Sequence, residues 1–344
     1  MTDDVSSAKD ERYSRQTRFA ELGKEGQKRL ADARVAIVGC GALGSTQAEL
    51  LARAGVGAIR VIDRDYVEVS NLQRQMLFDE QDVRDSCPKA IAAARRLKAI
   101  NSTIKVESSV ADLRPGNAYD LLGDVELIMD GTDNFETRFL VNDLAVKRGI
   151  PWVYGAAVGS YGITMTIFPG QTCCLRCILP DPPGGVQPTC EIAGVLGPVT
   201  TAISALQSAD ALRILCGHAA LIKPLLTTID VWSGDLLQGE APPRNPNCPV
   251  CGRKEFNYLE GQARTPISLC GRNAVQISER TTPIDLKALG KQLASVGEVK
   301  VNEFVLRAHI GEFDITVFPD ARAIIKGTSD PVVARSIYAK YIGI

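Results

Sequence analysis

The stretch Arg34-Val-Ala-Ile-Val38 runs directly into Gly39-Cys-Gly-Ala-Leu-Gly44, and this junction decides the fold. The apolar run predicts a buried strand, and the apolar pattern that continues to about Ala54 predicts a helix. In the motif between them, the first glycine permits a tight turn, the second lets a phosphate or ribose approach the backbone, and the third lets helix and strand pack. The helix N-terminus offers N–H groups to an anion. We therefore expect a nucleotide site at this turn.

An acidic residue follows at the spacing that such a site needs. The next apolar strand, Ile59-Arg-Val-Ile62, ends at Asp63, which lies 19 residues beyond Gly44. A carboxylate at this place accepts hydrogen bonds from ribose hydroxyls. A glycine turn and an acid suit NAD as well as ATP, so other residues must decide which nucleotide binds.

Strands and helices alternate through the first half of the chain. We expect strands at residues 104–107, 125–129 and 152–156, and helices at residues 89–100, 117–122 and 135–147. This alternation predicts an α/β, Rossmann-like and mostly parallel sheet with helices on both faces. Residues 162–168 and 227–231 read as strands that extend the sheet in antiparallel fashion, with a long helix at 199–216 between them.

Composition excludes several classes of protein. The 344 residues are 45% hydrophobic and 23% charged with a net charge of −1, which is typical of a globular protein without general affinity for nucleic acid or anionic membranes. No apolar run approaches the roughly 20 residues that span a bilayer. Residues 1–11 are polar and resemble no signal peptide, so we expect them to be disordered and the protein to be cytoplasmic.

Donors suited to a polyphosphate favour ATP over NAD. Arg15, Asn71, Arg74 and Lys89 supply cationic or amide groups that a nicotinamide site does not need. The stretch Gly131-Thr-Asp-Asn134 follows a strand end, at the sheet edge where ligands bind in such folds. Its carboxylate could hold a magnesium ion against phosphate oxygens.

Five ordered motifs carry a specific resemblance. They are Arg12-Tyr-Ser-Arg-Gln16, Gly39-Cys-Gly-Ala-Leu-Gly44, Ser70-Asn-Leu-Gln-Arg-Gln75, Pro88-Lys89 and Gly131-Thr-Asp-Asn134. Over about residues 10–255 the chain resembles the ThiF/MoeB/HesA family, bacterial relatives of the ubiquitin-activating enzymes. The resemblance implies an adenylation domain at residues 12–255.

The resemblance also implies roles for single residues. Asp63 would bind the ATP ribose, and Asp133 would hold magnesium. Arg15 would reach a phosphate from the neighbouring subunit of a homodimer. The phosphates would be bound by Asn71, Arg74 and Lys89. The remaining nucleotide-binding positions would be Gly39, Gly41, Ala42, Gly44, Asp65, Ser70, Gln75 and Asn134. Ala42 stands where many relatives have a glycine, and its backbone N–H survives that change.

The implied reaction is attack on ATP by the C-terminal glycine carboxylate of a ubiquitin-like sulfur carrier protein resembling ThiS or MoaD. An acyl-adenylate forms, pyrophosphate leaves, and the product serves thiamine or molybdopterin biosynthesis. A carboxylate is already ionised near neutral pH, so no general base is needed. Two alternatives stay open: adenylation of another carboxylate, on a peptide or a tRNA base, and an NAD-dependent oxidoreductase.

Two CxxC pairs predict a metal site. Cys174 and Cys177, with Cys248 and Cys251, would surround zinc with four thiolates and leave no position for water, so the metal would be structural. A redox dithiol, or Cys173 as a substitute ligand, are the alternatives.

Two features have open roles. Cys190 follows a Pro/Gly-rich stretch that we expect to be a mobile loop; relatives carry a cysteine in this crossover loop, in some of them linked covalently to the carrier, so Cys190 is either a nucleophile or a bystander. Residues 256–344 read as a small α+β domain beyond the family core. This domain is too short for the rhodanese domain of some relatives, and the sequence does not assign its role.

Overall fold

The structure is a computed structural model that describes residues 11–180, 193–261, 268–269, 273–277 and 282–343. The disorder predicted for residues 1–11 falls almost wholly outside this part, as do the loop predicted around residues 181–192 and Cys190 within it. The described residues form two compact units, one ending at about residue 261 and the other built mainly from residues 268–343. No helix in the described ranges has both the length and the apolar character needed to cross a bilayer.

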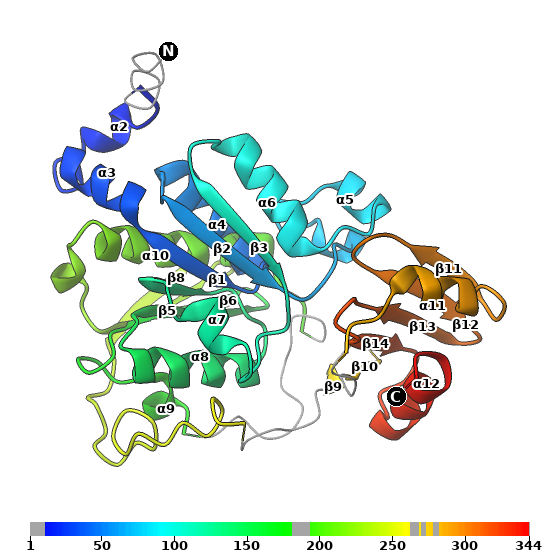
Figure 1. Cartoon of the computed structure of the whole chain (residues 1–344). Helices are drawn as coiled ribbons and strands as arrows, with labels where there is room; N and C mark the ends of the chain where they lie inside the picture. Colours follow the sequence, from blue (N-terminus) through cyan, green and yellow to red (C-terminus); the bar gives the residue numbers. More distant parts are fainter. Residues whose placement is uncertain (1–10, 181–192, 262–267, 270–272, 278–281, 344) are drawn as a thin grey trace. The chain divides into compact units, whose positions relative to one another are not determined.

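The first unit is built on one eight-stranded sheet in the order β3-β2-β1-β4-β5-β6-β7-β8 (Figure 1). Its strands are β1 (Arg34–Val38), β2 (Ala58–Asp63), β3 (Lys105–Val110), β4 (Leu127–Asp130), β5 (Trp152–Val158), β6 (Tyr161–Ile167), β7 (Leu225–Asp230) and β8 (Asp235–Glu240). Neighbours from β3 to β5 pair in parallel, and those from β5 to β8 are antiparallel. This confirms the predicted mixed Rossmann-like sheet.

Helices cover both faces of the sheet. The buried residues of the central strand β1 are all apolar, so each of its faces can pack against helices. Val35 and Ile37 pack in a core with helices α4 (Ala42–Ala54), α6 (Lys89–Ile100) and α10 (Gly197–Leu215). Ala36 and Val38 point the other way, into a core with α7 (Ala118–Leu122) and α8 (Phe135–Arg148). Period-two alternation of side chains places these residues on opposite faces of the sheet. The shorter elements are α2 (Ser14–Thr17), α3 (Gly23–Asp32), η1 (Val69–Asn71), α5 (Glu80–Arg84), α9 (Leu175–Ile178) and η2 (Ala219–Leu221).

The edge strand β8 was not predicted from the sequence. All six residues of β8 are exposed, so no buried face marks the sequence, and the strand is defined only by its pairing with β7. Two buried residues follow the predicted boundary at residue 255. Phe256 and Leu259 are buried in the same core as Phe139 of α8, so the first unit continues past them.

The second unit is a six-stranded antiparallel sheet with two helices, in the order β11-β12-β13-β14-β10-β9. Its elements are β9 (Ser268–Leu269), β10 (Ala274–Ile277), α11 (Leu286–Leu293), β11 (Glu298–Val301), β12 (Leu306–Ile310), β13 (Phe313–Val317), β14 (Ala323–Lys326) and α12 (Pro331–Tyr341). Leu289, Leu293 and Ile337 of the helices share a core with Val275 and Ile315 of the sheet. The predicted small α+β domain is confirmed.

Candidate active site and metal centre

The glycine turn closes tightly upon itself and on a distant loop. Gly39 has a φ of +83°, in the left-handed region that favours glycine. A Cβ atom on Gly44 would lie 1.8 Å from the carbonyl oxygen of Gly39, and one on Gly131 would lie 2.3 Å from the same oxygen. The backbone of the Gly131–Asn134 loop is therefore packed against the Gly39–Gly44 turn. Two motifs far apart in the sequence meet at the carboxyl edge of the parallel strands.

Asp63, at the end of β2, holds the glycine turn from the other side. Its carboxylate accepts hydrogen bonds from the backbone N–H of Cys40 at 2.6 Å and of Asp65 at 2.7 Å. Burial raises the pKa of Asp63, and the positive charge of Lys89 opposes that rise. Carboxylate oxygens have further lone pairs, so these bonds leave acceptor capacity for a ribose hydroxyl.

Lys89 brings a buried cation to the same edge. It is the first residue of α6, its side chain is only 6% exposed, and its ammonium group lies 3.6 Å from a carboxylate oxygen of Asp65. Its backbone N–H also donates to the carbonyl of Asp65 at 2.9 Å. A buried charge is stable only with a partner, and Asp65 supplies one here. Asp63, Asp65 and Lys89 thus form one charged cluster beside the glycine turn.

The Ser70–Gln75 segment contributes a buried amide. Gln75 is 4% exposed, and its amide nitrogen would lie 3.8 Å from a Cβ atom placed on Gly41. Its amide oxygen is buried and has no hydrogen-bond partner among the described residues. Arg74 donates to the carbonyl of Ser70 at 2.8 Å, and the side-chain oxygen of Asn71 accepts from the backbone N–H of Glu68 at 3.0 Å. The side chain of Gln75 therefore places its amide nitrogen beside the glycine turn.

Asp133 lies on the exposed surface of the Gly131–Asn134 loop. The side-chain amide of Asn134 donates to it at 3.3 Å, and the oxygen of that amide caps α8 by accepting from the backbone N–H of Thr137 at 2.9 Å. The charge of Asp133 contributes to raising the pKa values of Arg64 and Arg138. An accessible carboxylate at this edge is a suitable ligand for a divalent cation.

Two residues that were not predicted from the sequence, Arg138 and Asp130, shape this loop. Arg138 is buried on α8 and donates to the carbonyl oxygens of Thr132 at 2.7 Å and Gly155 at 3.2 Å. It also lies 3.3 Å from the buried carboxylate of Asp130, which in turn accepts from the N–H and hydroxyl of Thr132. The available signal was an acid at the end of an apolar strand and an arginine within an apolar helix.

Arg15 does not join this cluster within one chain. It is an exposed residue of α2, and the neighbouring Gln16 donates to the carbonyl of Ala54 at 2.9 Å, at the C-terminal end of α4. The glycine turn lies at the other end of α4, and a helix of this length spans roughly 20 Å.

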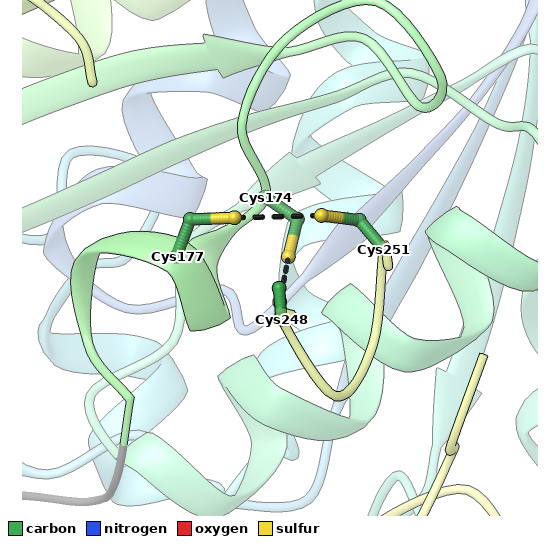
Figure 2. Close-up of side chains that lie close together, drawn as sticks. All are labelled: Cys174, Cys177, Cys248 and Cys251. Atoms are coloured by element: carbon green, nitrogen blue, oxygen red, sulfur yellow. Dashed lines mark hydrogen bonds between the residues drawn. The ribbon is translucent and has the colours of Figure 1, made fainter. Parts of the chain in front are cut away.

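Four cysteines converge in the first unit, as predicted (Figure 2). The sulfur atoms of Cys174, Cys177, Cys248 and Cys251 all lie within 4.8 Å of one another. The closest pairs are Cys174 with Cys248 at 3.6 Å and Cys177 with Cys251 at 3.4 Å. Burial raises the pKa of the Cys177 thiol to about 11, so a thiolate here needs a cation. Four sulfur atoms at this spacing fit a tetrahedral zinc ion.

Comparison with known proteins agrees with this geometry. Residues 13–250 match the model of the ThiF family. The chain is 47% identical to the sulfur carrier protein ThiS adenylyltransferase of Bacillus subtilis, covering 96% of this chain and 99% of that protein. It is 40% identical to the sulfur carrier protein adenylyltransferase of Thermus thermophilus, over 70% of this chain and 90% of that one. The crystal structure of E. coli MccB with MccA-N7isoASN superposes with a TM-score of 0.61 at 25% identity, covering 70% and 75% of the two chains. The chain belongs to the ThiF family.

Proposed function

We propose that this protein is an adenylyltransferase that uses ATP to activate the C-terminal glycine carboxylate of a ubiquitin-like sulfur carrier protein. The observation that carries the proposal is the meeting of the Gly39–Gly44 turn, the Asp63–Asp65–Lys89 cluster and the Gly131–Asn134 loop at one sheet edge. The two relatives described above are both sulfur carrier adenylyltransferases by name. Neither of them is an NAD-dependent oxidoreductase by name.

The reaction balances without a general base. A carboxylate oxygen of the carrier forms a bond to the α-phosphorus of ATP, the bond from that phosphorus to the bridging oxygen breaks, and pyrophosphate leaves with its electrons. Because no proton moves in this step, the protein needs to supply position and charge stabilisation only.

The residues of the site divide this work. Asp63 binds the ribose, while the backbone of Gly39, Gly41, Ala42 and Gly44 allows the nucleotide to approach closely. Lys89, with Arg74 and Asn71, neutralises charge that accumulates on the phosphates. Asp133, which accepts a hydrogen bond from Asn134, would hold magnesium, and that ion would draw electron density from the phosphate oxygens. The other members of the set are Asp65, which keeps Lys89 charged and in place, Ser70, whose carbonyl orients Arg74, and Gln75.

The proposal has four further parts. Arg15 acts from the neighbouring subunit of a homodimer, because in its own chain it lies at the far end of α4. Zinc on the four cysteines has a structural role. Cys190 as a covalent link to the carrier stays a prediction, as does the choice between thiamine and molybdopterin biosynthesis.

The test is carrier-dependent exchange of labelled pyrophosphate into ATP. The wild-type protein should catalyse exchange only with a carrier that ends in Gly-Gly, and Asp133→Ala should lower the rate by about 100-fold, the range seen when one charge-stabilising group is removed. Asp32→Ala is the matched control, since Asp32 is an exposed carboxylate at the end of α3. Exchange that depends on a short peptide would favour the alternative carboxylate substrate. Binding of NAD without exchange for any carboxylate would refute adenylation.

A further inference from the structure

Helix α10 carries a buried polar stripe that the proposed function does not yet use. Thr200, Ser204, Gln207 and Ser208 lie on one face, at most 3% exposed, in a helix that packs against α4 and strands β5 and β6. Burying polar groups costs free energy unless each finds a hydrogen-bond partner. The hydrogen-bond partners of these side chains therefore show which segments of the chain α10 keeps in place.

Ser204 and Gln207 reach the nucleotide-binding motifs, whereas Thr200 bonds to Gly197 within its own helix. The hydroxyl of Ser204 lies 2.7 Å from the carbonyl oxygen of Thr200 in its own helix and 3.0 Å from that of Leu43, in the first turn of α4. A Cβ atom on Gly197, where α10 begins, would lie 3.2 Å from the carbonyl oxygen of Gln73, so this helix start packs on the Ser70–Gln75 segment. The amide of Gln207 donates to the carbonyl of Asp130 at 3.1 Å and to that of Val153 at 3.1 Å.

A second buried glutamine shares the same acceptor. Gln47 of α4 donates to the carbonyl of Asp130 at 2.9 Å and to the side-chain oxygen of Gln207 at 2.6 Å, and both glutamines are 0% exposed. A Cβ atom on Gly155 would lie 2.5 Å from the amide nitrogen of Gln207, so β5 leaves room for this amide only because position 155 is glycine.

The shared acceptor is the residue that immediately precedes the Gly131–Asn134 loop. Two amide donors on the carbonyl of Asp130 resist rotation of the peptide that leads into that loop. Arg138, from α8 on the other face of the sheet, holds the carbonyl of Thr132 in the same loop. The loop that presents Asp133 is thus fixed from both faces of the sheet.

We infer that Gln47 and Gln207 are positioning residues for adenylation, which fix the carbonyl of Asp130 and thereby place Asp133 for its cation. This inference rests on the proposed function. Each glutamine acts through the backbone of the loop. Because displacement of about 1 Å can cost about 100-fold in rate, loss of these bonds should lower turnover more than it lowers substrate affinity.

The experiment compares Gln47→Met, Gln207→Met and the double variant, which keep side-chain volume and remove the donors. Ser208→Ala is the matched control, because Ser208 is buried on the same helix and its hydroxyl has no partner among the described residues. Thermal midpoints, kcat, the KM for carrier and the magnesium dependence of exchange are measured for each. We expect kcat to fall at least 10-fold in each single variant and the magnesium concentration for half-maximal rate to rise several-fold, with the KM for carrier unchanged. The increase in activation free energy in the double variant should not exceed the sum of the increases in the two single variants, because both donors bond to the same oxygen.

Gly155→Ala provides an independent route to the same effect, because the added methyl group displaces the amide of Gln207. It should reproduce the change in magnesium dependence. Folded glutamine variants with wild-type kcat and magnesium dependence would overturn the inference, and so would variants that all fail to fold, since that assigns the pair to stability alone. Wild-type protein without exchange activity would instead refute the proposed function, so the two failures are distinguishable.

Discussion

Asp143 lies outside the nucleotide site, yet its carboxyl group is completely buried on α8. One oxygen accepts from the backbone N–H groups of Tyr258 at 2.9 Å and Leu259 at 3.3 Å. The other oxygen has no partner among the described residues. Burial raises the pKa of Asp143 to about 7, against the opposing effects of these N–H groups and the charge of Arg176. Asp143 therefore holds the last segment of the first unit at some cost in free energy.

This cost depends on pH in a defined direction. The unfolded chain ionises Asp143 near pH 4, whereas the folded protein retains the proton until about pH 7. The unfavourable contribution is thus absent below pH 4, grows as pH rises to 7, and is complete above it, at a few kcal/mol by order of magnitude. Asp143→Asn keeps an acceptor for the N–H groups and cannot ionise. We expect its thermal midpoint, relative to wild type, to be higher at pH 8 than at pH 5. Asp32→Asn should show no such trend, and a constant difference for Asp143→Asn would contradict the raised pKa.

At the scale of elements, the four-cysteine cluster joins two loops of the first unit. Cys174 and Cys177 flank the start of α9, and Cys248 and Cys251 follow β8, so a metal ion would link segments more than 70 residues apart. Metal analysis should find about one zinc per chain. Cys251→Ser should lose the zinc and lower the thermal midpoint, because metal binding to such a site contributes directly to folding.

Cys173→Ala separates the four-cysteine site from its alternative. Cys173 is buried beside Cys174 but does not belong to the group of four sulfur atoms. The variant should retain full zinc content. If Cys173→Ala lost the zinc and Cys251→Ser retained it, Cys173 and not Cys251 would be a zinc ligand.

At the scale of the whole molecule, the proposed homodimer can be tested by mixing subunits that carry different substitutions. If Arg15 completes the partner's site, Arg15→Ala and Asp133→Ala subunits are each inactive alone, yet a mixed dimer contains one complete site. Equal mixing after dissociation should restore about a quarter of the wild-type exchange rate, because half of the dimers are mixed and half of their sites are complete. A mixture that stays inactive, or a protein that sediments as a monomer, would exclude action across subunits.

The sequence by itself determined the nucleotide-binding half of the fold. Strand–turn–helix junctions such as Val38–Gly44 are local, because the glycines, the apolar runs and Asp63 each act within a short stretch of chain. The spacing of Cys174, Cys177, Cys248 and Cys251 was equally legible, because CxxC pairs are local units. The glycine turn and Asp63 alone suit both ATP and NAD. The ordered motifs and their resemblance to a known family favoured ATP.

Only the tertiary structure decided what depends on pairing between distant segments. The contact of Gly131 with Gly39, the two amides on the carbonyl of Asp130 and the burial of Asp143 each require surfaces from several elements. Strand β8 has no buried face, so its six residues carry no pattern and only pairing with β7 reveals it. In a sequence, a polar side chain is by default interpreted as a surface group, and only the fold shows that it is buried. The sequence therefore showed the motifs that bind the nucleotide but not the buried groups that hold those motifs in place.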